Sequence, residues 1–209
     1  MIAKTFFGFE EILANELKML GAQDVEQGVR MVSFKGDKGF MYKANLSLRT
    51  ALKILKPIYF FKATNESQLY KGVQGINWSK FINANQTFVI DATVHSTHFN
   101  HSEFISQKCK DAIVDQFRDR TGQRPSIDKA HPDLRINIHI DKDQVSVALD
   151  TSGNSLHQRG YRSATNIAPI NEVLAAGILL LSGWDGQTDF LDPMCGSGTF
   201  LAEAAMIAC

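Results

Sequence analysis

The segment LDPMCGSGTFLAEAA, residues 191–205, restricts the possible folds of this chain more than any other stretch. The short run DFLD, 189–192, precedes a loop with two glycines, and an apolar, helix-forming run follows. Gly196 and Gly198 carry no Cβ, so the backbone can turn sharply there and approach a ligand closely. We therefore predict a strand, a tight loop and a helix, as at the ligand-binding edge of an open α/β sheet.

The glycine spacing argues against two common phosphate-binding loops. A G-x-G-x-x-G fingerprint needs a glycine where this chain has Leu201, and a P-loop needs a Gly-Lys-Ser/Thr sequence that does not follow here. N–H groups at the start of the next helix can still bind a carboxylate or a phosphate. Pro193 fixes the turn and Asp192 places a carboxylate at the crevice. A purely structural turn is the alternative, because glycine serves tight turns in general.

The first 64 residues alternate helical and strand patterns. Helical spacing of apolar residues marks 8–22 and 38–53, while 30–34 and 58–64 have the pattern of strands. This order is typical of a small ferredoxin-like unit. We assign residues 1–64 to it.

A second α+β unit is expected over residues 65–155. A bridging helix over about 66–82 comes first, followed by a strand at 87–94 and a helix at 102–122 that Ser102 can cap and Gly122 ends. Apolar and polar residues then alternate on both sides of the turn DKDQ, which predicts a β-hairpin of strands 134–140 and 145–150.

Residues 156–209 form the third region, which begins in the polar linker 152–166 and continues into a helix at 170–184 that is apolar on most faces. The most apolar run, 173–181, is far shorter than the roughly 20 residues that span a bilayer. The three cysteines form no C-x-x-C pair, so free thiols in a reducing cytoplasm fit best. The whole chain is expected to be an α+β protein with no membrane partner.

Charge is unevenly distributed along the chain. Residues 1–165 hold all 22 Lys and Arg with 17 Asp and Glu, whereas 166–209 hold five acidic residues and no basic one. A mildly cationic front part can meet a polyanion, and the tail has the composition of a core with a small site.

The glycine loop and its flanks resemble THUMP-containing RNA methyltransferases. The likeness rests on DPMCGSGT, on the preceding APINEVLAAGILLLSGW, and on HSEFISQKCKDAIVDQF, RPSIDKAHPDLRINIHIDKDQVSVALDTSG and SLHQRGYR upstream. It covers most of the chain and is strongest from about 101 to 208. It implies a ferredoxin-like unit, a THUMP domain and the first β-α element of a Rossmann-like methyltransferase domain. Among such enzymes is the bacterial one that methylates the N2 of a guanine in large-subunit ribosomal RNA.

The resemblance also implies a cofactor and its binding residues. S-adenosylmethionine would lie against the glycine loop, and the segment 168–172 would pack beside that loop. No metal is implied. The cofactor-binding candidates are Asp192, Pro193, Cys195, Gly196, Ser197, Gly198 and Thr199.

Ribosomal RNA is the expected partner, and phosphate binding needs Lys and Arg on one face. The Lys and Arg residues on the 102–122 helix do not share one face at 100° per residue. The basic residues of the loop and of the linker look more concentrated. Tyr161 can stack on an unpaired base or anchor the linker. The RNA-binding candidates are Lys108, Lys110, Arg124, Lys129, Arg135, Arg159, Tyr161 and Arg162.

Two features limit the activity expected of the 209 residues. These methyltransferases hold the target amino group with an Asn-Pro-Pro-Tyr-type motif downstream of the glycine loop, and no such motif occurs here. We therefore expect a truncated methyltransferase domain that is inactive alone, with its catalytic residues beyond Cys209. An adenine-N6 DNA methyltransferase fragment and a non-catalytic RNA-binding module are the alternatives. His95, His98 and His101 lack partnering cysteines, so a surface loop is expected there and not a zinc site.

Overall fold

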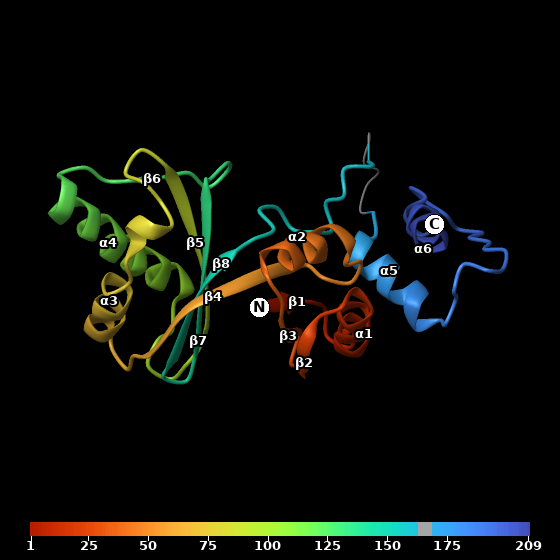
Figure 1. Ribbon diagram of the computed structural model, residues 1–209, viewed down its shortest axis with the longest axis horizontal. Helices are drawn as coiled ribbons and strands as arrows, with labels where there is room; N and C mark the ends of the chain where they lie inside the picture. Colours follow the sequence, from red (N-terminus) through yellow and green to blue (C-terminus); the bar gives the residue numbers. More distant parts are fainter. Residues whose placement is uncertain (163–168) are drawn as a thin grey trace. The chain divides into compact units, whose positions relative to one another are not determined.

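The computed structural model describes residues 1–162 and 169–209 and divides the chain into two compact units. One unit comprises Met1–Ile54 and Asn154–Cys209, and the other comprises Leu55–Gly153. Figure 1 labels the elements of both units.

The N-terminal segment has the element order of a ferredoxin-like fold, β-α-β-β-α-β. Strands β1 and β2 each pair antiparallel with β3, and β4 leads the chain into the other unit. Leu13, Leu17, Val32, Phe34 and Ile54 form much of its core. The elements are β1 (Ile2–Lys4), α1 (Glu10–Leu20), β2 (Gln23–Gly28), β3 (Met31–Lys35), α2 (Lys38–Ser47) and β4 (Lys53–Lys62).

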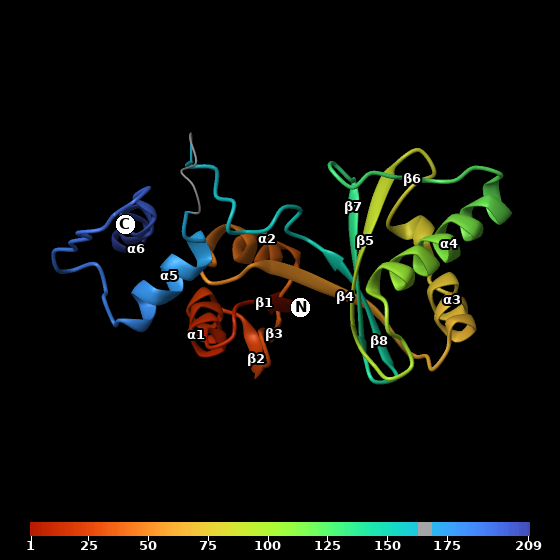
Figure 2. The same ribbon diagram turned by 180° about the vertical axis from the view of Figure 1, so that it is seen from behind.

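The second unit is a sheet in the order β4-β8-β7-β5-β6, with α3 and α4 on one face (Figure 2). Strands β5 and β7 run parallel, whereas β8 pairs antiparallel with both β7 and β4. Ile136, Ile138 and Ile140 point into the core, as the alternation of the hairpin predicts. The elements are α3 (Glu66–Gln74), η1 (Trp78–Lys80), β5 (Thr87–His95), α4 (Ser102–Thr121), β6 (Ser126–Ile127), β7 (Leu134–Asp141) and β8 (Gln144–Asp150).

Several predicted boundaries differ from those observed. The predicted helix 38–53 ends at Ser47, because Leu48 is extended and the chain turns there to enter β4. The helix expected at 66–82 is split into α3 and the short 3-10 turn η1. The residue that caps α4 is His101, whose side chain makes no capping bond, so Ser102 is not the cap. Gly122, with φ +71°, ends α4 as predicted.

The C-terminal segment packs α5 (Glu172–Leu181) onto the ferredoxin-like segment. A Cβ at Gly177 would lie 2.1 Å from the ring of Phe9, which is itself buried. Glycine is therefore required here by close approach, despite its low helix propensity. Further along, Arg49 donates a hydrogen bond to the carbonyl of Met206 in α6 (Thr199–Ala208). These contacts make residues 1–54 and 154–209 one unit.

We expect Gly177→Ala to lower the free energy of unfolding by about 1–3 kcal/mol, because the added methyl overpacks against Phe9. Urea titration followed by circular dichroism would measure the change. The matched control is Gly39→Ala in α2, where the nearest atom to a new Cβ is at an ordinary 3.4 Å, so that variant should be neutral or more stable. Adding Phe9→Leu to Gly177→Ala should recover part of the loss. Equal stability of the two alanine variants would contradict this packing.

Candidate functional site

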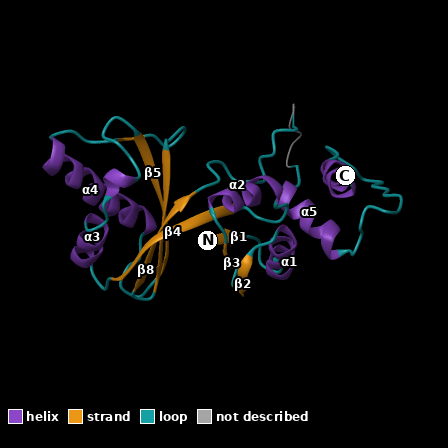
Figure 3. Ribbon diagram, in the orientation of Figure 1, coloured by secondary structure: helices purple, strands orange, loops and turns teal. Residues whose placement is uncertain are grey.

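The glycine loop is formed largely as predicted, but its leading strand is not. Residues 189–192 form no strand, and Figure 3 shows a loop from α5 to α6. A strand exists only when neighbouring backbone satisfies its N–H and C=O groups, and no described strand pairs with this segment. The strand prediction is therefore wrong here, while the loop and the helix that follows it are confirmed.

The two glycines give the loop its shape. Gly196 has φ +54° and Gly198 has φ +73°, a region that other residues rarely adopt. The N–H of Gly198 donates to the carbonyl of Cys195 at 2.7 Å, which closes a turn directly before α6. Gly198 is the N-cap of α6 and offers no side-chain acceptor. The first N–H groups of that helix are thus available to an anionic group.

The rest of the predicted loop is mostly at the surface. Pro193, Cys195 and Ser197 are exposed, and Asp192 is half-buried and accepts a hydrogen bond from the N–H of Met194 at 3.1 Å. Thr199 is buried. The donors at the helix start, together with a carboxylate at the loop entrance, fit the carboxylate and the amino group of an amino-acid moiety.

Arg162 fastens this loop to the start of α5. Its guanidinium pairs with Glu172 at 2.6 Å and donates to the carbonyl of Ile170 at 2.8 Å. The same group donates to Thr199 Oγ1 at 2.9 Å and to Ser197 Oγ at 3.4 Å. One side chain therefore joins the linker, the first turn of α5 and the glycine loop. Glu172 lies where the segment 168–172 was expected to pack beside the loop, although Ala168 lies outside the described residues.

A second buried pair holds the middle of α6. Arg159 lies 2.8 Å from Glu203, whose side chain is fully buried, and donates to the carbonyl of Arg49 at 2.6 Å. Tyr161 donates its hydroxyl to the other oxygen of Glu203 at 3.1 Å. Burial raises the pKa of Glu203 above its usual value, although Arg159 acts in the opposite direction. Burial, and next the charge of Glu203, raise the pKa of Tyr161 to about 12.

These contacts bear on three of the predicted RNA-binding residues. Arg159 and Arg162 are both mostly buried and have intrachain carboxylate partners, and the hydroxyl of Tyr161 is also used internally. Their donors are thus committed to holding α5 and α6. Tyr161 is still 39% exposed, and RNA contact by these three residues stays a prediction.

Three predicted RNA-binding residues do come together, in a groove of about 450 Å³ on the second unit. Lys110 enters from α4, Arg135 from β7, and Lys129 from the loop between β6 and β7. Ser106 and Gln107 add polar groups to the same wall. Lys110 also pairs with Asp111 at 2.8 Å, and both groups are partly exposed, so water weakens that pair. Asp91 and Glu103 line the same groove, so its three basic residues exceed its acidic ones by one. A groove with a small positive excess and neutral polar groups can bind a phosphate backbone.

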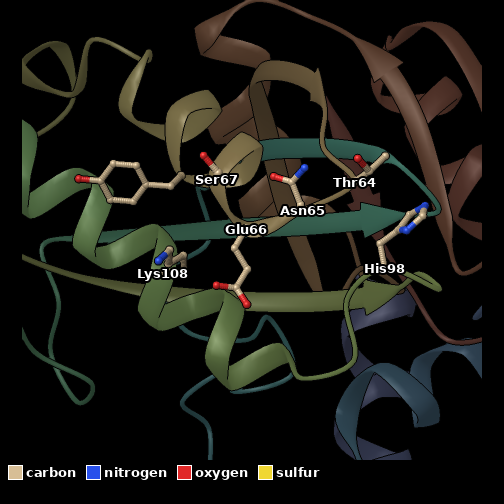
Figure 4. Close-up of a pocket in the computed structure, with 7 residues that line it drawn as sticks. Thr64, Asn65, Glu66, Ser67, His98 and Lys108 are labelled. Carbon is tan, nitrogen blue, oxygen red and sulfur yellow. The ribbon is translucent and has the colours of Figure 1, made fainter.

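Lys108 and Arg124 lie elsewhere. Residues two apart on a helix point about 200° apart, so Lys108 lines a different pocket, near the start of α3. Figure 4 shows it with Glu66 and His98, and its ammonium lies 5.8 Å from the ring centre of Tyr70. Hydrogen bonding to Asp115, followed by burial, raises the pKa of Tyr70 to about 12. Arg124 is exposed in the loop after α4.

The histidines are dispersed and do not converge on a site. His95 stacks edge-on against His139, with ring centres 5.8 Å apart, and His98 lines the pocket of Lys108. Across the described ranges, no three His, Cys, Asp or Glu side chains gather as metal ligands would.

Three family profiles match successive parts of the chain. Residues 1–55 match the RlmL ferredoxin-like domain, 63–150 the THUMP domain, and 159–209 the RMKL-like methyltransferase domain. The chain therefore carries a THUMP domain between ferredoxin-like and methyltransferase segments. The predicted α+β fold class is confirmed.

Three similar known proteins carry the name methyltransferase or methylase. The chain is 45% identical over 204 residues to the ribosomal RNA large subunit methyltransferase K/L of Syntrophotalea carbinolica, a match to 96% of this chain and 29% of that protein. A predicted N6-adenine-specific DNA methylase from Listeria monocytogenes is 32% identical, with a TM-score of 0.85 over 99% of this chain and 54% of that one. SMU.472, described as a putative methyltransferase and solved as a complex with SAH, is 34% identical, with a TM-score of 0.84 over 99% of this chain and 55% of that one. The chain thus spans less than a third of the curated relative and about half of these solved chains.

The linker after the THUMP domain makes buried ion pairs that the sequence did not reveal. Glu172 and Glu203 were not among the predicted site residues, yet they hold the linker arginines in place. The only signal was the tail itself, with its five acidic residues and no base. Two of those acids are buried, which requires a cation from outside the tail.

We expect the contribution of Glu203 to the stability of the chain to decrease as the pH rises, whereas that of an ordinary paired carboxylate increases. Because the folded-state pKa of Glu203 is raised, the folded state binds its proton more tightly than the unfolded state does. The contribution of Glu203 to stability is therefore present at acid pH and is lost as the pH rises from about 4.5 through the folded-state pKa.

Urea unfolding of the wild type and of Glu203→Gln, at several pH values from 4 to 8, would measure this. The stability of the wild type relative to the variant should fall as the pH rises. A difference that grows with pH would mean that Arg159 outweighs burial.

Proposed function

We propose that this chain is the RNA-binding and cofactor-loop part of an S-adenosylmethionine-dependent methyltransferase, acting on the N2 of a guanine in large-subunit ribosomal RNA. The observation that carries the proposal is the order of domains. A THUMP domain whose groove is lined by three basic residues is followed by a glycine loop and a helix without a side-chain cap. The 45% identity to a protein named as a ribosomal RNA methyltransferase supports the RNA substrate. The guanine N2 rests on the family resemblance.

The cofactor fits the loop chemically. S-adenosylmethionine supplies an activated methyl on a sulfonium, and its amino-acid part carries a carboxylate and an ammonium. The N–H groups at the start of α6 would bind the carboxylate, and Asp192 would accept from the ammonium. Gly196 and Gly198 leave room for close approach of the ligand. The complex of SMU.472 with SAH supports the assignment of the same cofactor to this site.

The second unit would supply the RNA grip. Lys110, Lys129 and Arg135 would contact phosphates and fix the position of the RNA without reading its sequence. Lys108 lines a different pocket on the opposite side of α4, and Arg124 is exposed in the loop after α4, so neither belongs to this groove. An enzyme acting on an exocyclic amine must take the base out of its stack, so RNA held firmly on both sides of the target favours the reaction.

We expect the 209-residue chain alone not to transfer methyl groups, since the sequence holds no Asn-Pro-Pro-Tyr-type motif for the acceptor amine. Incubation with radiolabelled S-adenosylmethionine and ribosomal RNA would test this. Clear incorporation of radiolabelled methyl groups into RNA would contradict this expectation and would mean that the acceptor site lies within these residues.

A competition assay separates the RNA proposal from the adenine-N6 DNA alternative, which the name of the Listeria relative favours. Ribosomal RNA, transfer RNA and duplex DNA would compete for the labelled chain at one stated salt concentration. We expect ribosomal RNA to bind most tightly, and tighter binding of duplex DNA would overturn the choice. Calorimetric titration with S-adenosylmethionine tests the third hypothesis, that the chain is a non-catalytic RNA-binding module. Such a module would give no heat of binding.

Neutralising the groove should weaken RNA binding. We expect the triple variant Lys110→Gln, Lys129→Gln and Arg135→Gln to bind RNA about 10-fold more weakly at low salt, with a shallower salt dependence, because up to three phosphate contacts are lost. Fluorescence anisotropy at several salt concentrations would measure both effects. The control removes the same charge from the exposed Lys62, Lys71 and Lys80 of the same unit. An equal loss in both triple variants would mean a diffuse charge effect and no specific groove.

A further inference from the structure

The linker guanidinium of Arg162 makes more contacts than charge neutralisation of one carboxylate requires. It reaches four acceptors in two segments: Glu172 and the Ile170 carbonyl by α5, and Ser197 and Thr199 in the glycine loop. Both charged side chains are largely buried, at 16% and 7% exposure. Thr199, which begins α6, is almost completely buried.

The shape of the arginine side chain makes this bridging possible. A guanidinium is planar and presents five N–H donors in a fixed fork, whereas an ammonium is a compact charge with three rotating donors. Here the Nε atom faces Glu172 while the two terminal nitrogens face Ile170, Thr199 and Ser197. Lysine would keep the charge and could not hold both segments at once in this geometry.

We propose that Arg162 is a positioning residue for the cofactor, which holds the glycine loop in the conformation that exposes the N–H groups at the start of α6. It acts through Ser197 and Thr199 and through the carbonyl before α5. The proposal rests on the proposed function of the loop as an S-adenosylmethionine site.

The competing explanation is that Arg162 serves only to neutralise the buried carboxylate of Glu172. The double variant Arg162→Met with Glu172→Gln separates the two explanations, because it removes the bridge and leaves no unpaired buried charge. The matched control is Arg159→Met with Glu203→Gln. That pair is also buried, and the described contacts of Arg159 go to Glu203 in the middle of α6 and to the carbonyl of Arg49, not to the loop. Each double variant is measured at the same number of degrees below its own melting temperature, so that a difference in overall stability does not affect the comparison.

Amide hydrogen exchange measures how easily the loop opens, and it needs no ligand. The N–H of Gly198, bonded to Cys195, reports on the loop, and the N–H of Gly122, bonded to Arg118 in the other unit, is the internal reference. We expect exchange at Gly198 to be about 10-fold faster in Arg162→Met/Glu172→Gln, and nearly unchanged in the control, because opening of the loop becomes easier. Arg162→Lys should also exchange faster. Unchanged exchange at Gly198, or full rescue by lysine, would overturn the proposal.

Calorimetric titration with S-adenosylhomocysteine then tests the consequence for binding. We expect the dissociation constant to rise about 10-fold in the Arg162 double variant and to stay within twofold in the control, in line with the loss of preorganisation. Equal affinities in the two double variants would contradict a positioning role. If the wild-type chain binds no S-adenosylhomocysteine, the proposed function of the loop in this chain fails, while the exchange result still decides whether Arg162 holds the loop.

Discussion

Two buried arginine–glutamate pairs determine how the methyltransferase segment is held. The linker from 151 to 162 contains no helix or strand, so no repeating backbone hydrogen bonds fix its path. Arg159 and Arg162 replace those bonds, one reaching Glu203 in α6 and the other Glu172 in α5. Buried ion pairs contribute little net stability compared with apolar packing, but breaking one leaves a charge that the interior cannot solvate. The pairs therefore act mainly by permitting one arrangement of linker and helices and penalising others.

This arrangement also explains the uneven charge along the chain. The cation-free tail looks at first like a core with no electrostatic role, yet two of its five acids are buried in α5 and α6. Their charges are balanced by Arg159 and Arg162 in the linker just before the tail. Two basic residues of the front part are therefore used in the interior. The cations left at the surface of the second unit include Lys110, Lys129 and Arg135, which share a groove. The excess of basic residues thus divides between internal pairing and a surface that suits a polyanion.

The sequence predicted what local chemistry determines and missed what distant partners determine. Alternation fixed the hairpin of β7 and β8, and glycine spacing located the loop at 196–198, because both signals lie within a few residues. The largely polar, exposed β2 was missed, and a strand was wrongly expected at 189–192, since strands exist through their neighbours. The ion pairs were missed for the same reason. Glu203 lies 44 positions from Arg159, and no periodicity connects them.

The conformation of the candidate loop depends more on the contacts that hold it than on its own sequence. Gly196 and Gly198 adopt positive φ readily, and the same freedom allows them many other conformations in the absence of restraint. The turn from Gly198 to Cys195 is a single hydrogen bond at the surface, which contributes only about 1 kcal/mol. A loop of this kind binds tightly only if the ordering cost is met before the ligand arrives. The bonds from Arg162 to Ser197 and Thr199 provide that order, and under the proposed function the N–H groups at the start of α6 are then in position before the cofactor binds.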